Sequence, residues 1–155
     1  PIIRKCLDFT INQPEQMIFM VQKEVGEKIC PVREGKAVKK FKRTVLSMSV
    51  EVFAEAEYAF TVPREDFSPI PNVDSCFIHI KKRDTPLVPK ELQKDFFTVV
   101  NGAFSARRKK LKNTLPSYFG IKEDKIFTEI DSNQRPEDIT IEDFIQLTKQ
   151  IQPYL

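Results

Sequence analysis

Residues 67 to 75, Phe-Ser-Pro-Ile-Pro-Asn-Val-Asp-Ser, place an aromatic ring beside two prolines at alternate positions. Pro69 and Pro71 each fix φ at about −65°, lack a backbone donor and keep the preceding residue out of the helical region. We therefore predict a stiff, extended loop that cannot join a sheet, with the closing Asp-Ser pair capping the turn. The ring can stack on an unpaired base, or it can fill the core while the prolines keep two strand ends from aggregating. Taken alone, the residues favour the core interpretation for Phe67.

Two clusters of basic residues could bind phosphate. Residues 97 to 120 carry five positive charges and no negative one, on Arg107, Arg108, Lys109, Lys110 and Lys112. Residues 33 to 43 carry six positive charges and one negative charge, and the six include Lys39, Lys40, Lys42 and Arg43. Residues 121 to 155 carry four positive and eight negative charges, so the net charge of +3 hides a segregated distribution. Such segregation indicates a polyanionic partner, although two solvated faces explain it equally well.

Metal and disulfide chemistry are not expected. The three cysteines are unevenly spaced, without a Cys-x-x-Cys pair, and His79 is the single histidine. This pattern argues against structural zinc and suits a reducing cytosol.

No apolar run approaches the roughly 18 residues needed to span a bilayer, so we expect a cytoplasmic protein with no membrane partner. We expect His79 to have no catalytic role, and the methionines Met17, Met20 and Met48 to lie in the core.

The elements that position these residues begin with an α/β pattern. Apolar residues near the start of the chain indicate the end of a helix, and MIFMV at 17 to 21 is a short apolar run typical of a strand buried on both faces. QKEVGEKIC follows directly and has the spacing of a helix. Gln22, Lys23 and Glu24 stand at this junction, where strands of such sheets face a ligand crevice, although an ordinary helix start explains them equally well.

Residues 45 to 62 are ambiguous because apolar residues occupy every even position from Leu46 to Val62, which favours a strand. Seventeen residues are too many for one strand, so a helix to about Ala54 followed by a strand is more economical. CFIHIKK at 76 to 82 alternates as a second strand, and we expect the two strands to pair in antiparallel fashion across the proline loop.

The pattern becomes helical after the polar segment RDTPLVPKE, which marks a boundary. We predict units at 1–84 and 85–155, the second one all-helical. An apolar stripe from Leu92 to Phe104 leads into the basic cluster and continues to Phe119, with Gly120 as a C-cap. Thr140 and Asp143 are spaced as a capping box before the last helix.

Four ordered motifs resemble the second half of the bacterial small-subunit ribosomal RNA adenine dimethyltransferases. They are FMVQKEV at 19 to 25, FSPIPNVDS at 67 to 75, AFSARRKKLKNTL at 103 to 115 and RPEDITIEDF at 135 to 144. The resemblance spans essentially the whole chain. Related enzymes that dimethylate large-subunit RNA share the proline loop, but the basic segment, which we predict to be helical, followed by RPEDITIEDF favours the small-subunit group.

The resemblance implies the C-terminal part of a Rossmann-like, S-adenosylmethionine-dependent methyltransferase domain, followed by a small all-α domain. It implies transfer of two methyl groups to N6 of each of two adjacent adenosines in the 3′-terminal hairpin of small-subunit RNA, with this RNA and the immature small subunit as partners. In this light, we expect Phe67, held by Pro69 and Pro71, to stack on the target adenine. We expect the residues that contact RNA phosphates to be Arg107, Arg108, Lys109, Lys110 and Lys112, together with Lys39, Lys40, Lys42 and Arg43.

The sequence also departs from the family. The family's glycine-rich cofactor turn, its ribose-binding acidic residue and its Asn-Leu-Pro-Tyr active-site motif all precede the position of Pro1 and are not among these 155 residues. We therefore expect no cofactor-binding residue here, no methyl transfer by this chain alone, and a longer complete enzyme. Two alternatives stay open: a large-subunit dimethyltransferase, and a non-catalytic RNA-binding module of ribosome assembly. At Lys42 to Val45, KRTV replaces the family's usual Tyr-Gly-Arg.

Overall fold

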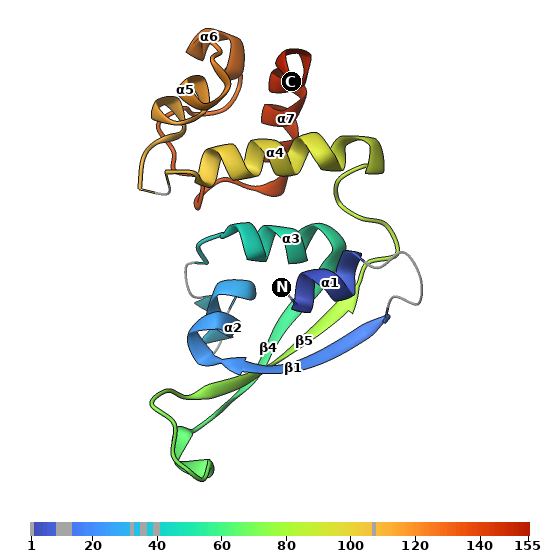
Figure 1. Cartoon of the computed structure of the whole chain (residues 1–155), viewed down its shortest axis with the longest axis vertical. Coiled ribbons are helices and arrows are strands. Elements are labelled where there is room, and N and C mark those ends of the chain that lie inside the picture. The colour runs from blue at the N-terminus through green and yellow to red at the C-terminus, as the bar shows by residue number, and fades with distance from the viewer. Residues whose placement is uncertain (1, 9–13, 32, 35–36, 39–40, 107) are drawn as a thin grey trace. The chain divides into compact units, whose positions relative to one another are not determined.

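The computed structural model describes residues 2–8, 14–31, 33–34, 37–38, 41–106 and 108–155. The chain divides into two compact units, Pro1–Thr85 and Pro86–Leu155. The first unit combines a sheet with helices, and the second is built from helices (Figure 1). The α/β class expected from the sequence is confirmed.

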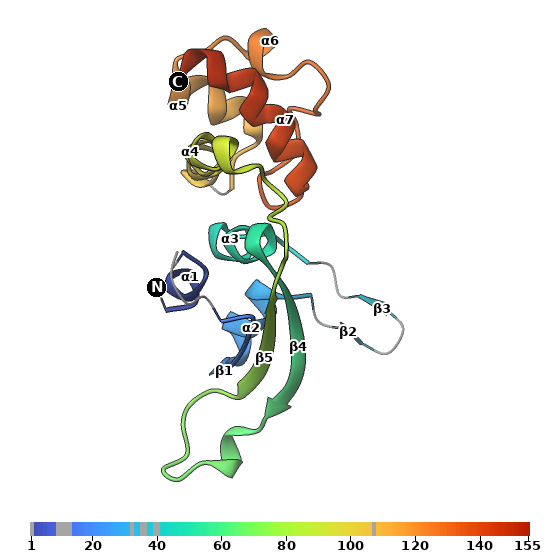
Figure 2. The same ribbon diagram turned by 90° about the vertical axis from the view of Figure 1, so that its right-hand side faces the viewer.

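The first unit is a three-stranded antiparallel sheet covered by helices on one face (Figures 1 and 2). The strand order is β1-β5-β4, and a two-stranded β2-β3 ladder is separate from this sheet. Its helices and strands are α1 (Ile2–Asp8), β1 (Gln16–Gln22), α2 (Lys23–Ile29), β2 (Arg33–Glu34), β3 (Ala37–Val38), α3 (Val45–Phe53), β4 (Ala54–Val62) and β5 (Ser75–Lys82).

Strand β5 forms the centre of the sheet, and its alternating pattern places apolar residues against the helices. Cys76, Ile78 and Ile80 are fully buried and pack in one core with Ile29 and Val50. Burial of an isoleucine side chain stabilises a fold by about 1.5–3 kcal/mol. The predicted strand at 76 to 82 and its antiparallel pairing across the proline loop are confirmed.

The ambiguous segment is a helix that passes directly into a strand, as predicted. Helix α3 starts at a capping box, in which Thr44 Oγ1 accepts the Ser47 N–H at 3.1 Å and Ser47 Oγ accepts the Thr44 N–H at 2.8 Å. Ala54 takes extended dihedrals and begins β4. The register against β5 shifts between Tyr58 and Phe60, which marks a bulge.

Strand β1 is not buried on both faces, contrary to our prediction. Met17 is buried toward the helices, but Ile18 is 71% exposed and Met20 is 52% exposed on the opposite face. Burial on both faces requires a second layer, and the described helices of this unit cover one face of the sheet. Of the three methionines expected in the core, Met17 and Met48 are buried and Met20 is not.

The second unit packs its helices around aromatic residues. Phe96 and Phe144 are fully buried with ring centroids 6.2 Å apart at 70°, and Phe104 stacks on Phe144 at 6.2 Å and 21°. Its helices are α4 (Gln93–Phe104), α5 (Leu115–Phe119), α6 (Glu123–Ile126) and α7 (Ile141–Ile151). The expectation of an all-helical unit holds for the residues described in this unit, which include no strand. No helix in the described part of the chain is long and apolar enough to cross a membrane.

Both predicted helix ends of this unit are confirmed. Gly120 ends α5 with φ of 68°, a left-handed conformation that favours glycine. Thr140 begins α7 through a capping box, because its Oγ1 accepts the Asp143 N–H at 3.1 Å while Asp143 Oδ2 accepts the Thr140 N–H at 3.0 Å.

Thr140→Ala is expected to lower the free energy of unfolding by about 1 kcal/mol, because the helix loses the hydroxyl that satisfies an end N–H. Thr140→Ser, which keeps the hydroxyl, is the matched control and should stay within a few tenths of a kcal/mol of the original protein. Urea unfolding measures both. Equal losses in the two variants would assign the effect to the lost methyl group.

Candidate functional site

The proline loop connects β4 to β5 and extends beyond the end of the sheet (Figures 1 and 2). It begins with the 3-10 helix Arg64–Asp66, and the Ser68–Pro69 peptide bond is cis. No residue between the two strands takes part in a strand, as predicted. Ile70 and Val73 are 63% and 47% exposed, so the tip of the loop presents apolar surface.

Phe67 lies on this loop, outside the buried core of the first unit. Its side chain is half-buried, and its N–H donates to the Arg64 carbonyl at 3.2 Å. Pro69 is exposed and Pro71 is half-buried. The structure therefore places a half-buried aromatic residue on a loop that two prolines constrain.

The loop faces the junction of β1 and α2, which the sequence had singled out. A hollow of about 400 Å³ lies between them. Its lining combines the junction with both ends of the loop: Gln22, Lys23, Glu24, Glu27, Arg64, Asn72, Val73 and Asp74. Asp74 Oδ1 accepts the Arg64 N–H at 3.2 Å, so Asp74 caps the turn as expected, whereas Ser75 is the first residue of β5.

The basic cluster of the second unit lies in a connection, and the helix predicted there is wrong. Helix α4 ends at Phe104, where both the N–H and the hydroxyl of Ser105 donate to the Gly102 carbonyl. Such side-chain bonds compete with the helical ladder. The Leu111 and Lys112 N–H groups donate to the Gln134 and Ser132 carbonyls at 2.9 and 3.0 Å, which ties the connection to a second segment of the same unit.

This connection presents its charges to solvent. Arg108, Lys109 and Lys110 are exposed, and Lys112 is half-buried. The structure records no ion pair to these four side chains among the residues it describes, although Lys110 Nζ lies 3.4 Å from Asn133 Oδ1. Arg107 lies outside the described residues.

The structure describes two residues of the other predicted cluster, Lys42 and Arg43. Lys39 and Lys40 lie outside the described residues, and Lys42 is exposed. Arg43 forms a two-point ion pair with Glu51, with Nε to Oε2 at 3.0 Å and Nη2 to Oε1 at 3.1 Å, and its side chain is 20% exposed. Because Arg43 is engaged in this pair, we leave it out of the RNA surface proposed below.

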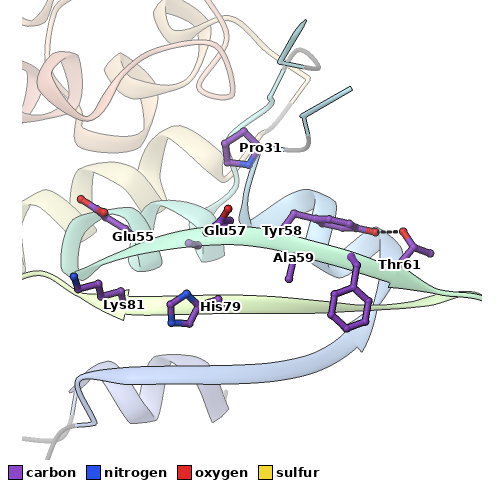
Figure 3. Close-up of a pocket in the computed structure, with 10 residues that line it drawn as sticks. Pro31, Glu55, Glu57, Tyr58, Ala59, Thr61, His79 and Lys81 are labelled. Atoms are coloured by element: carbon purple, nitrogen blue, oxygen red, sulfur yellow. Dashed lines mark hydrogen bonds between the residues drawn. The ribbon is translucent and has the colours of Figure 1, made fainter. Parts of the chain in front are cut away.

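A larger hollow, of about 670 Å³, lies along β4 (Figure 3). Figure 3 shows side chains of both charges around it, from Glu57 and Lys81, and the Tyr58 hydroxyl bonded to Thr61 at 2.7 Å. None of the predicted site residues that the structure describes lines it. His79 is half-buried beside it, and its Nε2 lies 3.0 Å from Gln16 Oε1.

Cys30 and Cys76 are buried, which makes their thiols poor nucleophiles. Burial raises the pKa of the Cys30 thiol to about 12, and burial also raises the pKa of Cys76, so Cys30 stays protonated at neutral pH. Among the described residues, no group of three or more His, Cys, Asp and Glu side chains could hold a metal ion.

The three glycines that the structure describes do not form a glycine-rich turn. A binding site for S-adenosylmethionine of the kind that the family uses needs such a turn after a strand. Gly26 is inside α2, Gly102 is inside α4 and Gly120 caps α5, so these glycines serve helix packing and helix ends.

A comparison with known protein families gives a match over almost the whole chain. The family model described as "Ribosomal RNA adenine dimethylase" matches residues 1–153. The ribosomal RNA small subunit methyltransferase A of Fusobacterium nucleatum is 43% identical over 155 residues, covering 96% of this chain and 56% of that protein. The protein of the same name from Enterococcus faecalis is 35% identical over 160 residues, covering 98% of this chain and 52% of that protein. The chain therefore spans about half the length of these curated relatives.

Two solved structures share the fold. A dimethyladenosine transferase from Plasmodium falciparum superposes with a TM-score of 0.71 at 16% identity, covering 99% of this chain and 62% of that one. The 23S rRNA methyltransferase ErmE superposes with a TM-score of 0.61 at 18% identity, covering 97% of this chain and 59% of that one. At these identities the likeness shows the fold alone.

Proposed function

This chain belongs to the ribosomal RNA adenine dimethylase family, and from that premise we propose that the full-length protein transfers methyl groups to N6 of two adjacent adenosines in small-subunit ribosomal RNA. The name shared by the bacterial relatives supports the small subunit over the large one. The immature small subunit is then the natural partner, and the cytoplasm is the compartment. The observation that carries the proposal is the half-buried Phe67 on a proline loop outside the core.

S-adenosylmethionine is the methyl donor in this proposal, and it would supply an electrophilic methyl group. Because the family's glycine-rich turn and Asn-Leu-Pro-Tyr motif are not among these 155 residues, we assign its binding to a part of the full-length protein that this chain does not span. The contribution of this chain is to hold the RNA and the target base. The exocyclic amine of adenine is a poor nucleophile since its lone pair is delocalised into the ring, so precise positioning of the base is the main requirement.

Phe67 meets that requirement by stacking on an adenine turned out of its helix. A flipped base loses the stacking of its neighbours. An aromatic ring can replace this stacking whatever the identity of the base. The support must be rigid, because small displacements between reacting groups reduce rates strongly. Pro69 and Pro71 supply this rigidity by fixing the backbone on both sides of Ile70.

The exposed basic connection binds the RNA backbone. A-form RNA hides its base edges in a deep, narrow groove, so recognition through phosphates and shape is expected. Arg108, Lys109 and Lys110 are exposed on an ordered turn, which suits phosphate contacts better than a mobile tail would.

Replacing Arg108, Lys109 and Lys110 together with alanine should weaken RNA binding equally across sequences. Each lost phosphate contact should flatten the dependence of log K on log salt by up to about one unit. Binding titrations at several salt concentrations measure this slope.

The matched control replaces Lys122, Lys125 and Lys149, three exposed lysines of the same unit, with alanine. This variant has the same change in net charge and should keep most of the original slope. An equal loss of slope in both variants would indicate that the cluster is an ordinary solvated face without a specific role in RNA binding.

Footprinting on the two purified ribosomal subunits tests the choice of substrate. We expect the full-length protein to protect a segment of small-subunit RNA. Protection confined to the large subunit would overturn the assignment.

A further inference from the structure

We propose that Asp74 is a positioning residue that closes the proline loop and holds it to the start of α2, so that Phe67 meets the target adenine at a fixed place. This inference rests on the function proposed above. It goes beyond the cap that the sequence predicts for Asp74, because it also concerns the contact of Asp74 with Lys23, a residue far away in the sequence.

Three contacts made by Asp74 carry the inference. Its Oδ1 accepts the Arg64 N–H at 3.2 Å, which joins the two ends of the loop. Its carbonyl accepts the Lys23 N–H at 3.0 Å, and its Oδ2 lies 3.5 Å from Lys23 Nζ. One residue therefore connects the first turn of the loop, the start of β5 and the start of α2.

One further hydrogen bond links these Asp74 contacts to Phe67. The Arg64 carbonyl accepts the Phe67 N–H at 3.2 Å, so the peptide units of Arg64 link Asp74 on one side to Phe67 on the other. Without the Asp74 carboxylate, the 3-10 turn that holds Phe67 loses the side-chain bond to the far end of the loop.

Because these groups are partly exposed, a positioning role can be distinguished from a contribution to stability. The Lys23 and Asp74 side chains are 43% and 35% exposed, and ion pairs at such sites contribute little to folding. A displaced catalytic support, in contrast, can reduce a rate strongly without unfolding the protein. The expected signature is a loss of rate with unchanged thermal stability and unchanged RNA affinity.

The test is a double-mutant cycle in the full-length protein, with single-turnover methyl transfer to undermethylated small subunits as the readout. Asp74→Ala should slow transfer by about tenfold and leave subunit affinity within about twofold. The double variant Asp74→Ala/Phe67→Ala should be no slower than Phe67→Ala, because Asp74 acts through Phe67.

Two lysines of α2 provide a matched pair of controls. Lys23→Met removes the ammonium group beside Asp74 but keeps the backbone N–H, and it should slow transfer by about two- to threefold. Lys28→Met removes an ion pair to Glu24 within the same helix. Lys28 does not line the hollow beside the loop, so this variant should leave the rate unchanged.

Amide hydrogen exchange gives a readout independent of activity. In Asp74→Ala, the Arg64 and Phe67 amides should exchange faster while the β5 amides keep their protection. If Asp74→Ala perturbs folding, Asp74→Asn retains an acceptor for the Arg64 N–H and should keep the Arg64 amide protected.

The outcomes separate the two proposals. If Phe67→Ala retains the original rate, the stacking function itself is wrong. If Phe67→Ala slows transfer but Asp74→Ala does not, or if the two effects multiply in the double variant, the positioning role is wrong. Unchanged exchange at Arg64 and Phe67 in Asp74→Ala would also overturn it.

Discussion

Phe67→Ala is expected to slow methyl transfer by the full-length protein by roughly 5-fold to 150-fold, since stacking of one base on an aromatic ring is worth about 1–3 kcal/mol. Affinity for the small subunit should stay nearly unchanged, because we assign phosphate binding to the basic connection of the other unit. Methyl transfer under single-turnover conditions and equilibrium binding to the same subunits measure the two effects separately.

Two further substitutions at this position distinguish stacking from packing. Phe67→Tyr keeps an aromatic face and should retain most of the rate. Phe67→Leu keeps an apolar side chain of similar size without an aromatic face, and its rate should resemble that of Phe67→Ala. A leucine variant with the original rate, or an alanine variant that fails to fold, would instead support the core interpretation.

Gly26→Ala should destabilise the first unit by about 1–3 kcal/mol, the cost typical of an overpacked core. A Cβ at this position would lie 2.3 Å from Cys76 Sγ and 3.3 Å from Ile78 Cγ2, both within the buried core. The direction is opposite to that of an ordinary helix interior, where alanine in place of glycine stabilises by up to about 1 kcal/mol. Chemical denaturation of the full-length protein measures the change.

The Cys76→Ala background tests the cause of this destabilisation. Removal of Sγ opens the space that the new Cβ needs, so Gly26→Ala should cost much less there than in the original protein. An equal cost in both backgrounds would show that Cys76 is not the obstacle.

The pattern of apolar residues predicted much of the first unit correctly. The alternation in 76 to 82 specified a strand with Cys76, Ile78 and Ile80 on one buried face, because side chains of a strand alternate between faces. The division of 45 to 62 into helix and strand follows from its length and from the helical spacing of Leu46, Val50 and Phe53, and the structure makes the change at Ala54. These features depend on neighbours along the chain, which the sequence displays directly.

Features that depend on distant partners were not predictable. The short apolar run of β1 indicated burial on both faces, but burial of Ile18 and Met20 depends on a second layer that no local pattern encodes. Arg43 stands among basic neighbours that indicate an RNA contact, and the sequence does not display its ion pair with Glu51, eight residues later.

The basic segment after α4 illustrates a different limit. The apolar stripe continues across this segment to Phe119, and arginine and lysine favour helices. Together these features predict one long helix. Hydrogen bonds from Ser105 at its start and to Ser132 and Gln134 at its end outweigh that weak preference. The same tertiary contacts define the ordered turn that presents Arg108 and Lys109.

The most direct test of the proposed function is mass spectrometry of ribosomal RNA after incubation of undermethylated small and large subunits with the full-length protein and S-adenosylmethionine. We predict N6,N6-dimethyladenosine at two adjacent positions of the small-subunit RNA and none in the large-subunit RNA. Dimethyladenosine found in large-subunit RNA alone, or tight small-subunit binding without any methyl transfer, would contradict the assignment.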